Sequence, residues 1–112
     1  MNNDQSHSAS SLRLIERDLY LPGRERAIRL RPTEASLLAT LLRYSNQIVS
    51  RATLMREVWQ TDFLDDTRTL DVHIHWLRRK IEDNPNRPRR LVTVKGVGYC
   101  LMVESKRQKG PQ

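Results

Sequence analysis

The chain has 112 residues, 38% of them hydrophobic, which is enough for one small domain and too little for two hydrophobic cores. No apolar run reaches the roughly 18 residues of a membrane-spanning helix, and residues 1–11 lack the basic start and apolar stretch of a signal peptide. A single cysteine, Cys100, excludes an internal disulfide framework and an all-cysteine metal site, which indicates a reduced, cytoplasmic setting.

Basic residues outnumber acidic ones, and the excess lies in the second half of the chain. Twenty Lys and Arg residues against thirteen Asp and Glu residues give a formal charge of +7. Residues 1–66 carry nine groups of each sign, whereas residues 67–100 carry eight basic and three acidic groups. This distribution is typical of a domain with one surface for a polyanion, although a solvated basic surface without a partner would have the same composition.

The N-terminal part predicts a leader followed by a small antiparallel sheet. Residues 1–11 are polar and have no apolar periodicity, so we expect a disordered leader or linker. Arg17-Asp18 and Pro22-Gly23 are turn signals between short apolar runs. These runs alternate apolar and polar residues, and they predict strands at 12–16, 19–21 and 27–30.

A first helix is expected to begin at Pro32 and to run to about Tyr44. Thr33 can cap its free amides, and Glu34 places negative charge at the positive end of the helix dipole. Leucines recur at three- and four-residue spacing, which predicts one apolar stripe. The stripe consists of Leu37, Leu38, Leu41 and Leu42.

A second helix is predicted over 51–59, with Ser50 as its cap. The loop 60–66, which contains three aspartates, follows it. The residues of this helix that we expect to face the core are Leu54, Met55 and Val58.

The third helix, over 67–83, has the clearest pattern. At 100° per residue, four aliphatic side chains fall within roughly 60° of one another and form a narrow core stripe. They are Leu70, Ile74, Leu77 and Ile81. The residues on the opposite side are Arg68, Val72, His75, Trp76 and Arg79. The polar segment 84–88 contains two prolines and therefore ends the helix.

The chain then predicts a β-hairpin with strands at 91–94 and 99–103. Residues 95–98 form its tip, where glycines supply the positive φ that a tight turn needs. We expect Cys100 to pack in the second strand and residues 104–112 to form a disordered tail.

Three helices followed by a hairpin describe a winged helix-turn-helix, an α+β fold with an N-terminal antiparallel sheet, over residues 12–103. The third helix of such a domain is wide enough to fill the major groove of B-DNA. It must bury one stripe to be held rigid while it presents a polar stripe to bases and phosphates. Residues 67–83 meet both demands.

Several spaced motifs resemble the output domain of OmpR/PhoB-type response regulators. They are Pro32-Thr33-Glu34 with Leu37-Leu38, Ser50-Arg51 with Leu54 and Val58-Trp59, and the segments 69–74, 77–82 and 92–99. The resemblance implies a four-stranded N-terminal sheet, with its fourth strand near 47–49. It also implies tandem binding to direct repeats in double-stranded DNA for transcription regulation. The family normally carries a phosphorylatable receiver domain upstream, and these 112 residues contain none.

The resemblance implies roles for residues of the third helix. Its first residues resemble phosphate contacts, and these are Arg68 and Thr69. The positions that would face the groove floor are those of Val72, His75 and Trp76. Nearer to the DNA backbone would be His73, Arg78 and Arg79. Family members often have arginine or another hydrogen-bonding side chain at His75 and Trp76, and a tryptophan cannot make the bidentate contact of arginine with guanine.

Outside the third helix, the resemblance implies four further contacts. Thr93 is similar to a phosphate contact at the base of the wing, and Lys95 to a basic wing residue that enters the minor groove. Trp59 is similar to another backbone contact, although it is equally well a core aromatic residue. The loop 60–66 is similar to a segment that touches RNA polymerase in the family.

Some of these residues are also compatible with other functions. Exposed Val72 and Trp76 would also suit a winged-helix module that docks on a protein, since tryptophan is enriched in binding hot spots. Asp71 and His75 have the spacing of a metal pair, but two ligands on one helix are too few, so we expect no metal or cofactor. The sequence has no nucleophile–base pair and no phosphate loop, and we expect no enzymatic activity.

Overall fold

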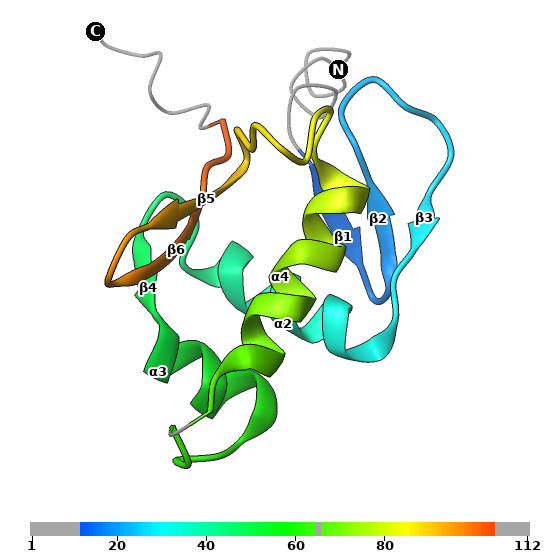
Figure 1. The fold of residues 1–112 in the computed structure, drawn as a ribbon. Coiled ribbons are helices and arrows are strands. Elements are labelled where there is room, and N and C mark those ends of the chain that lie inside the picture. The colour runs from blue at the N-terminus through cyan, green and yellow to red at the C-terminus, as the bar shows by residue number, and fades with distance from the viewer. Residues whose placement is uncertain (1–11, 65, 105–112) are drawn as a thin grey trace, which may run out of the picture.

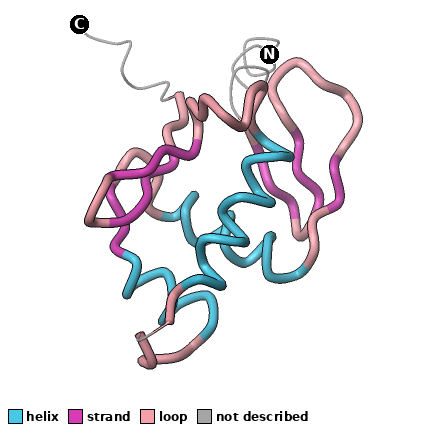
Figure 2. Tube along the Cα trace, in the orientation of Figure 1, coloured by secondary structure: helices cyan, strands magenta, loops and turns pink. Residues whose placement is uncertain are grey.

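The computed structural model describes residues 12–64 and 66–104 of the chain. Within them, a group of three helices lies between two three-stranded antiparallel sheets, as Figure 1 and Figure 2 show. This is the predicted α+β winged helix, with one sheet before the helices and a hairpin after them. The predictions for residues 1–11, and for the tail beyond Glu104, concern residues outside the described part.

The N-terminal sheet follows the chain order β1-β2-β3. Its strands are β1 (Arg13–Ile15), β2 (Asp18–Tyr20) and β3 (Ile28–Arg29). All three predicted strands are therefore confirmed: β1 and β3 are shorter than predicted, and β2 begins and ends one residue earlier. The first turn lies at Glu16-Arg17, one residue before the predicted Arg17-Asp18, because Asp18 belongs to β2 and pairs with both Ile15 and Arg29.

The first helix, α2 (Pro32–Arg43), follows an N-cap at Arg31. Thr33 therefore lies inside the first turn, and the prediction that it caps the helix is wrong. Glu34 does act at this end, because its Oε1 accepts hydrogen bonds from the Arg31 amide at 2.9 Å and from the Lys80 ammonium at 2.7 Å. The apolar stripe is confirmed, since its members are buried or packed against the core: Leu37, Leu38, Leu41 and Leu42.

The second helix is α3 (Arg51–Leu54), which continues as a π-helical segment, η1 (Met55–Trp59). Ser50 caps it as predicted, because its Oγ accepts a hydrogen bond from the Thr53 amide at 3.1 Å. The segment ends at Gln60, whose φ of 58° is left-handed. The inward residues predicted here are buried or packed against the core: Leu54, Met55 and Val58.

The third helix, α4 (Arg68–Ile81), packs against α2 and is slightly shorter than the predicted 67–83. Its four predicted core residues are each at most 1% exposed: Leu70, Ile74, Leu77 and Ile81. Glu82 ends the helix, because its buried carboxylate accepts hydrogen bonds from three backbone amides at 2.7–3.0 Å. The donors are Arg89, Arg90 and Leu91.

The C-terminal sheet has the order β4-β6-β5. Its strands are β4 (Ile48–Ser50), β5 (Leu91–Val94) and β6 (Gly98–Leu101). The four-stranded N-terminal sheet implied by the resemblance is wrong here, because β4 pairs with β6 instead. The reason is the core contact: Val49 lies opposite Tyr99 in the ladder, and both side chains are buried.

Two glycines shape the hairpin for different reasons. Gly96 has a φ of +77° and fills the predicted role at the tip. Gly98 has no positive φ; it lies in β6 opposite Ser50, and a Cβ at this position would be 1.9 Å from the Val49 carbonyl oxygen. The backbones of β4 and β6 can pair here only because position 98 has no side chain.

We expect Gly98→Ala to lower the free energy of unfolding by about 3 kcal/mol, because the β4 backbone must move to admit the methyl group. Gly96→Ala is the matched control: nothing lies within 4 Å of its Cβ, so only the positive φ opposes it, at a cost of about 1 kcal/mol. Urea unfolding of both variants measures the difference, and equal losses would contradict the close approach of β4.

Candidate nucleic-acid interface

The outer side of α4 is exposed as the sequence predicts. Val72 is 42% exposed and Trp76 is 38% exposed, which is high for large apolar side chains on a helix that packs in a core. The charged and polar members of this side are exposed as well, namely Arg68, His75 and Arg79. One helix therefore combines a completely buried stripe with an open one.

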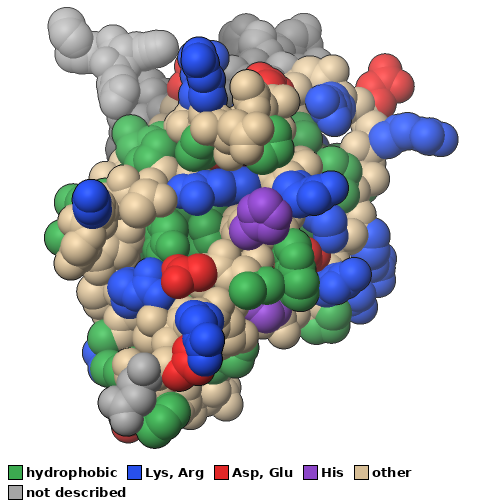
Figure 3. Space-filling view, viewed as in Figure 1, with side chains coloured by type: hydrophobic (Ala, Val, Ile, Leu, Met, Phe, Trp, Pro, Cys, Tyr) green, Lys and Arg blue, Asp and Glu red, His purple; other side chains and the backbone are tan. Residues whose placement is uncertain are grey.

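Basic side chains surround this open stripe. Figure 3 shows Lys and Arg side chains on both flanks of the face that carries α4, with hydrophobic and His side chains between them. Acidic side chains on this face are fewer. Five of the eight basic residues of 67–100 belong to α4 or the hairpin, which is a distribution expected of a surface for a polyanion. The other three line a hollow at the opposite end of the molecule.

Asp71, in the first turn of α4, joins three elements at one carboxylate. It accepts hydrogen bonds from Arg51 of α3 at 2.8 and 3.0 Å and from the Tyr99 hydroxyl of β6 at 2.7 Å. The hydrogen bonds from Arg51, and then that from Tyr99, hold the pKa of Asp71 below its usual value. Burial, with the neighbouring Asp71 charge, raises the pKa of the Tyr99 hydroxyl. The carboxylate therefore stays ionised and fixes the hairpin relative to the helix.

Arg78 makes a second link between α4 and the hairpin. Its Nε donates to the Leu91 carbonyl oxygen at 2.9 Å, and its Nη2 donates to the Thr93 hydroxyl at 2.8 Å. The guanidinium also lies 5.7 Å from the centre of the Tyr99 ring. Two of the predicted DNA contacts, Arg78 and Thr93, are thus bound to each other. The sequence pointed to neither bond, because three adjacent basic residues give no sign of which one turns toward the wing.

Three of the predicted contacts form an aromatic row. The His73 ring lies 5.1 Å from the Trp59 ring and 5.1 Å from the Trp76 ring, edge to face in both cases. The Nδ1 atom of His73 is 2.7 Å from the carbonyl oxygen of Thr69. The Thr69 residue is half-buried. Trp59 packs against the core as well, so the core and the interface interpretations of this residue are compatible.

Arg68 is the first residue of α4, and Lys95 belongs to the hairpin tip. The Arg68 guanidinium pairs with Asp66 at 2.8 Å, and the hydrogen bonds from Arg68 lower the pKa of that carboxyl to about 2. The pair is exposed, so a phosphate that meets Arg68 must compete with Asp66. Lys95 is exposed at the hairpin tip. In the loop 60–66, the exposed apolar side chains that the structure describes are Phe63 and Leu64.

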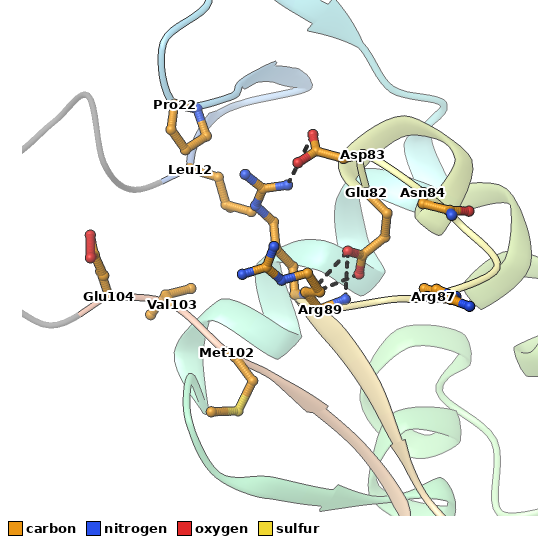
Figure 4. Close-up of a pocket in the computed structure, with 11 residues that line it drawn as sticks. Leu12, Pro22, Glu82, Asp83, Asn84, Arg87, Arg89, Met102, Val103 and Glu104 are labelled. Atoms are coloured by element: carbon orange, nitrogen blue, oxygen red, sulfur yellow. Dashed lines mark hydrogen bonds and ion pairs between the residues drawn. The ribbon is translucent and has the colours of Figure 1, made fainter.

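A separate hollow of about 560 Å³ lies at the other end of the molecule, where the segment after α4 meets the start of β1 and the residues beyond β6 (Figure 4). None of the predicted contacts lines it. Its most enclosed charged group is Glu82, whose carboxylate already binds backbone amides. The Glu82 carboxylate in this hollow therefore serves the turn that leads into β5.

Other kinds of site find no support in residues 12–64 and 66–104. No three His, Cys, Asp or Glu side chains there are grouped to hold a metal ion, and Asp71 of the considered metal pair is occupied by Arg51 and Tyr99. Among the same residues, no helix has the length and apolarity to cross a membrane.

Comparison with known sequences gives a consistent result. Residues 24–101 match the family described as "Transcriptional regulatory protein, C terminal". The alkaline phosphatase synthesis transcriptional regulatory protein SphR of Synechococcus elongatus is 46% identical over 77 residues, which are 69% of this chain and 30% of SphR. The chain thus spans about a third of the length of this curated relative.

Two solved structures share the fold. The RstA DNA-binding domain of Klebsiella pneumoniae, in complex with the RstA box, superimposes with a TM-score of 0.73 and 29% identity, over 82% of this chain and 91% of that one. The response regulator DrrB, a Thermotoga maritima OmpR/PhoB homologue, superimposes with a TM-score of 0.66 and 33% identity, over 76% of this chain and 37% of DrrB.

We expect Asp71→Asn to lower the free energy of unfolding by about 1 kcal/mol at pH 7, because it removes the charge that Arg51 and Tyr99 share. The folded-state pKa of Asp71 is lowered, so its stabilisation is present above the ordinary carboxyl pKa of about 4. It is lost as the pH falls through the lowered value. Urea unfolding between pH 7 and pH 3 should therefore show a shallower acid-side decline in the variant.

Asp83→Asn is the control for the loss of one carboxylate. The Asp83 side chain is 78% exposed and 4.0 Å from Arg90, so its replacement should change stability by less than about 0.5 kcal/mol. An Asp71→Asn protein whose stability runs parallel to the wild type over the whole pH range would contradict the assigned role.

Proposed function

The chain belongs to the family of C-terminal domains of transcriptional regulatory proteins, and from this premise we propose that it binds specific sequences in double-stranded DNA to regulate transcription. The observation that carries the proposal is the two-sided α4, with one stripe buried to 1% or less and the other exposed among basic side chains. The family is one of transcription regulators rather than enzymes. A cytoplasmic location follows from access to DNA.

In this proposal α4 enters the major groove. Val72, His75 and Trp76 face the base edges, because they occupy the middle of the exposed stripe. The residues at its margins contact the phosphates, namely Arg68, Thr69, His73, Arg78 and Arg79, with Trp59 beside them. The RstA domain, which is solved in complex with the RstA box, supports this use of the fold.

The hairpin acts as the wing. Asp71 and Arg78 fix it beside α4, so the groove-reading helix and the wing reach the duplex as one rigid surface. Lys95 at the tip enters the minor groove, and Thr93 contacts a phosphate while it accepts the Arg78 hydrogen bond. A preformed arrangement of this kind needs no ordering of the hairpin on binding.

We further propose that the domain is the output half of a two-component response regulator and binds in tandem to direct repeats. The likeness to the response regulator DrrB, 37% of which this chain covers, supports the first part. Exposed Phe63 and Leu64 give the loop 60–66 an apolar surface for RNA polymerase. Docking of Val72 and Trp76 on a protein partner is less favoured, because the Arg31 guanidinium lies 5.4 Å from the Trp76 ring and adds charge to that surface.

We expect Arg79→Ala and Lys95→Ala each to weaken binding to all DNA sequences and to reduce the slope of log K against log [salt] by about 0.9, the loss of one phosphate contact. Gel-shift titrations at several salt concentrations measure both effects. Arg24→Ala, in the loop between β2 and β3, is the matched control and should keep the wild-type slope. Unchanged slopes in both test variants would contradict the phosphate contacts. A weak salt dependence of the wild type would favour the protein-docking alternative.

Trp76→Arg should change which sequence is preferred, because an arginine at the groove floor can bind guanine with about 1–3 kcal/mol of discrimination. Selection of bound sequences from a random DNA pool, for wild type and variant, measures this directly. A gain of guanine at one position is the expected result, and identical selected sequences would remove Trp76 from the groove floor.

Half-sites repeated in the same direction about one helical turn apart would support tandem binding, whereas a palindrome would contradict it.

A further inference from the structure

A small hollow lies beside α4 on the flank that faces α2. Its volume is about 260 Å³, and it is lined by Arg31, Glu34, Trp76, Arg79 and Lys80. At 100° per residue, Lys80 and Arg78 lie about 160° apart around α4, on either side of the buried stripe. Because Arg78 binds the hairpin, the hollow is on the flank away from the wing. Trp76 and Arg79 already have roles in the proposed interface, whereas Arg31 has none.

The two most enclosed groups of the hollow neutralise each other. Glu34 is 1% exposed, and its Oε1 binds the Lys80 ammonium at 2.7 Å. Burial raises the pKa of Glu34, but the hydrogen bonds from Lys80 and from the Arg31 amide outweigh this effect and leave the pKa below its usual value. The ion pair therefore persists at neutral pH, and Lys80 is not the free cation of this site.

The two remaining cations, Arg31 and Arg79, are both exposed. Among the described residues, no acidic side chain forms an ion pair with either of them. The Arg31 guanidinium lies 5.4 Å from the centre of the Trp76 ring, which restricts its position by a cation–π contact. Two guanidinium groups with no acidic partner thus line one hollow, and a guanidinium matches the paired oxygens of a phosphate.

We propose that Arg31 and Arg79 bind a phosphodiester of the DNA strand opposite the one that the wing flank contacts, with the Trp76 ring supporting Arg31. This inference rests on the proposed function. A helix with its side chains is about 10–12 Å wide and the major groove about 12 Å, so both groove walls come close to α4. The wing flank offers Arg78 and Thr93 to one wall, and this hollow offers two guanidinium groups to the other.

The test measures which single phosphates each residue needs for binding. The DNA sequence selected from the random pool is synthesised with one neutral methylphosphonate at each position in turn, on either strand. Each duplex is titrated with wild type, Arg31→Gln and Arg26→Gln. Arg26→Gln makes the same charge change in the exposed loop between β2 and β3 and is the matched control. Some methylphosphonates weaken the wild type but not Lys95→Ala, and these mark the strand near the wing. One methylphosphonate on the strand across the groove from them should weaken wild-type binding about threefold to tenfold.

The same methylphosphonate should weaken binding by Arg31→Gln less than binding by the wild type, because only Arg79 still contacts that phosphate, while Arg26→Gln should respond as the wild type does. Arg31→Gln should also lower the salt slope by about 0.9 without changing the selected sequence. Arg31→Lys keeps the charge and loses the paired donors, so its sensitivity to this methylphosphonate should lie between those of the wild type and Arg31→Gln. Arg31 caps α2 through its backbone amide, so these variants should fold, and thermal unfolding followed by circular dichroism checks this.

Three results would overturn the proposal. The first is an Arg31→Gln protein that remains as sensitive as the wild type to every methylphosphonate. The second is an altered base preference with an unaltered phosphate pattern, which would make Arg31 a positioning residue for Trp76 only. The third is a change in tryptophan fluorescence with inorganic phosphate at constant ionic strength that Arg31→Gln abolishes, which would assign the hollow to a free anion. Failure of the proposed function is distinct, because the wild type itself would then show no salt-dependent DNA binding.

Discussion

The arrangement of the whole surface depends on one carboxylate. Asp71 lies in the first turn of α4. Its carboxylate accepts hydrogen bonds from two guanidinium nitrogens of Arg51 in α3 and from the hydroxyl of Tyr99 in β6. Three elements that are distant in the sequence are thereby held at one point, close to the exposed stripe of α4. Arg78 adds a second attachment two turns further along the helix. A helix alone could rotate relative to the hairpin, but a helix attached at two points cannot.

These attachments also show that the basic residues have two different kinds of role. Arg51 holds the molecule together, and Arg78 does so in addition to its proposed phosphate contact, so both guanidinium groups already have acceptors. Others, such as Arg79, Lys95 and Arg31, have no acidic partner among the described residues and lie around the exposed stripe. A net charge counts both kinds equally. The charge available to a polyanion is therefore smaller than the composition suggests, but it is placed on the flanks of one helix.

The sequence predicted the parts of the fold that follow from local pattern. The stripe of Leu70, Ile74, Leu77 and Ile81 and the cap at Ser50 depend on residue spacing and on one side chain. It did not predict that β4 would pair with β6, because a three-residue strand carries no periodicity and its partner is about fifty residues away. The same limit applies to Gly98, whose role is a contact with Val49, and to Arg78, whose acceptors lie in another element.

The way α4 ends has a consequence for variation among related chains. One carboxylate, that of Glu82, receives the amides of Arg89, Arg90 and Leu91 and so sets where β5 begins. The segment 83–88 between them contributes no strand or helix and is mostly exposed. Insertions and deletions there leave the ladder register of the hairpin intact, since the position of β5 is fixed from outside the segment. The length of this connection can therefore change while the geometry of the exposed stripe of α4 and the hairpin is preserved.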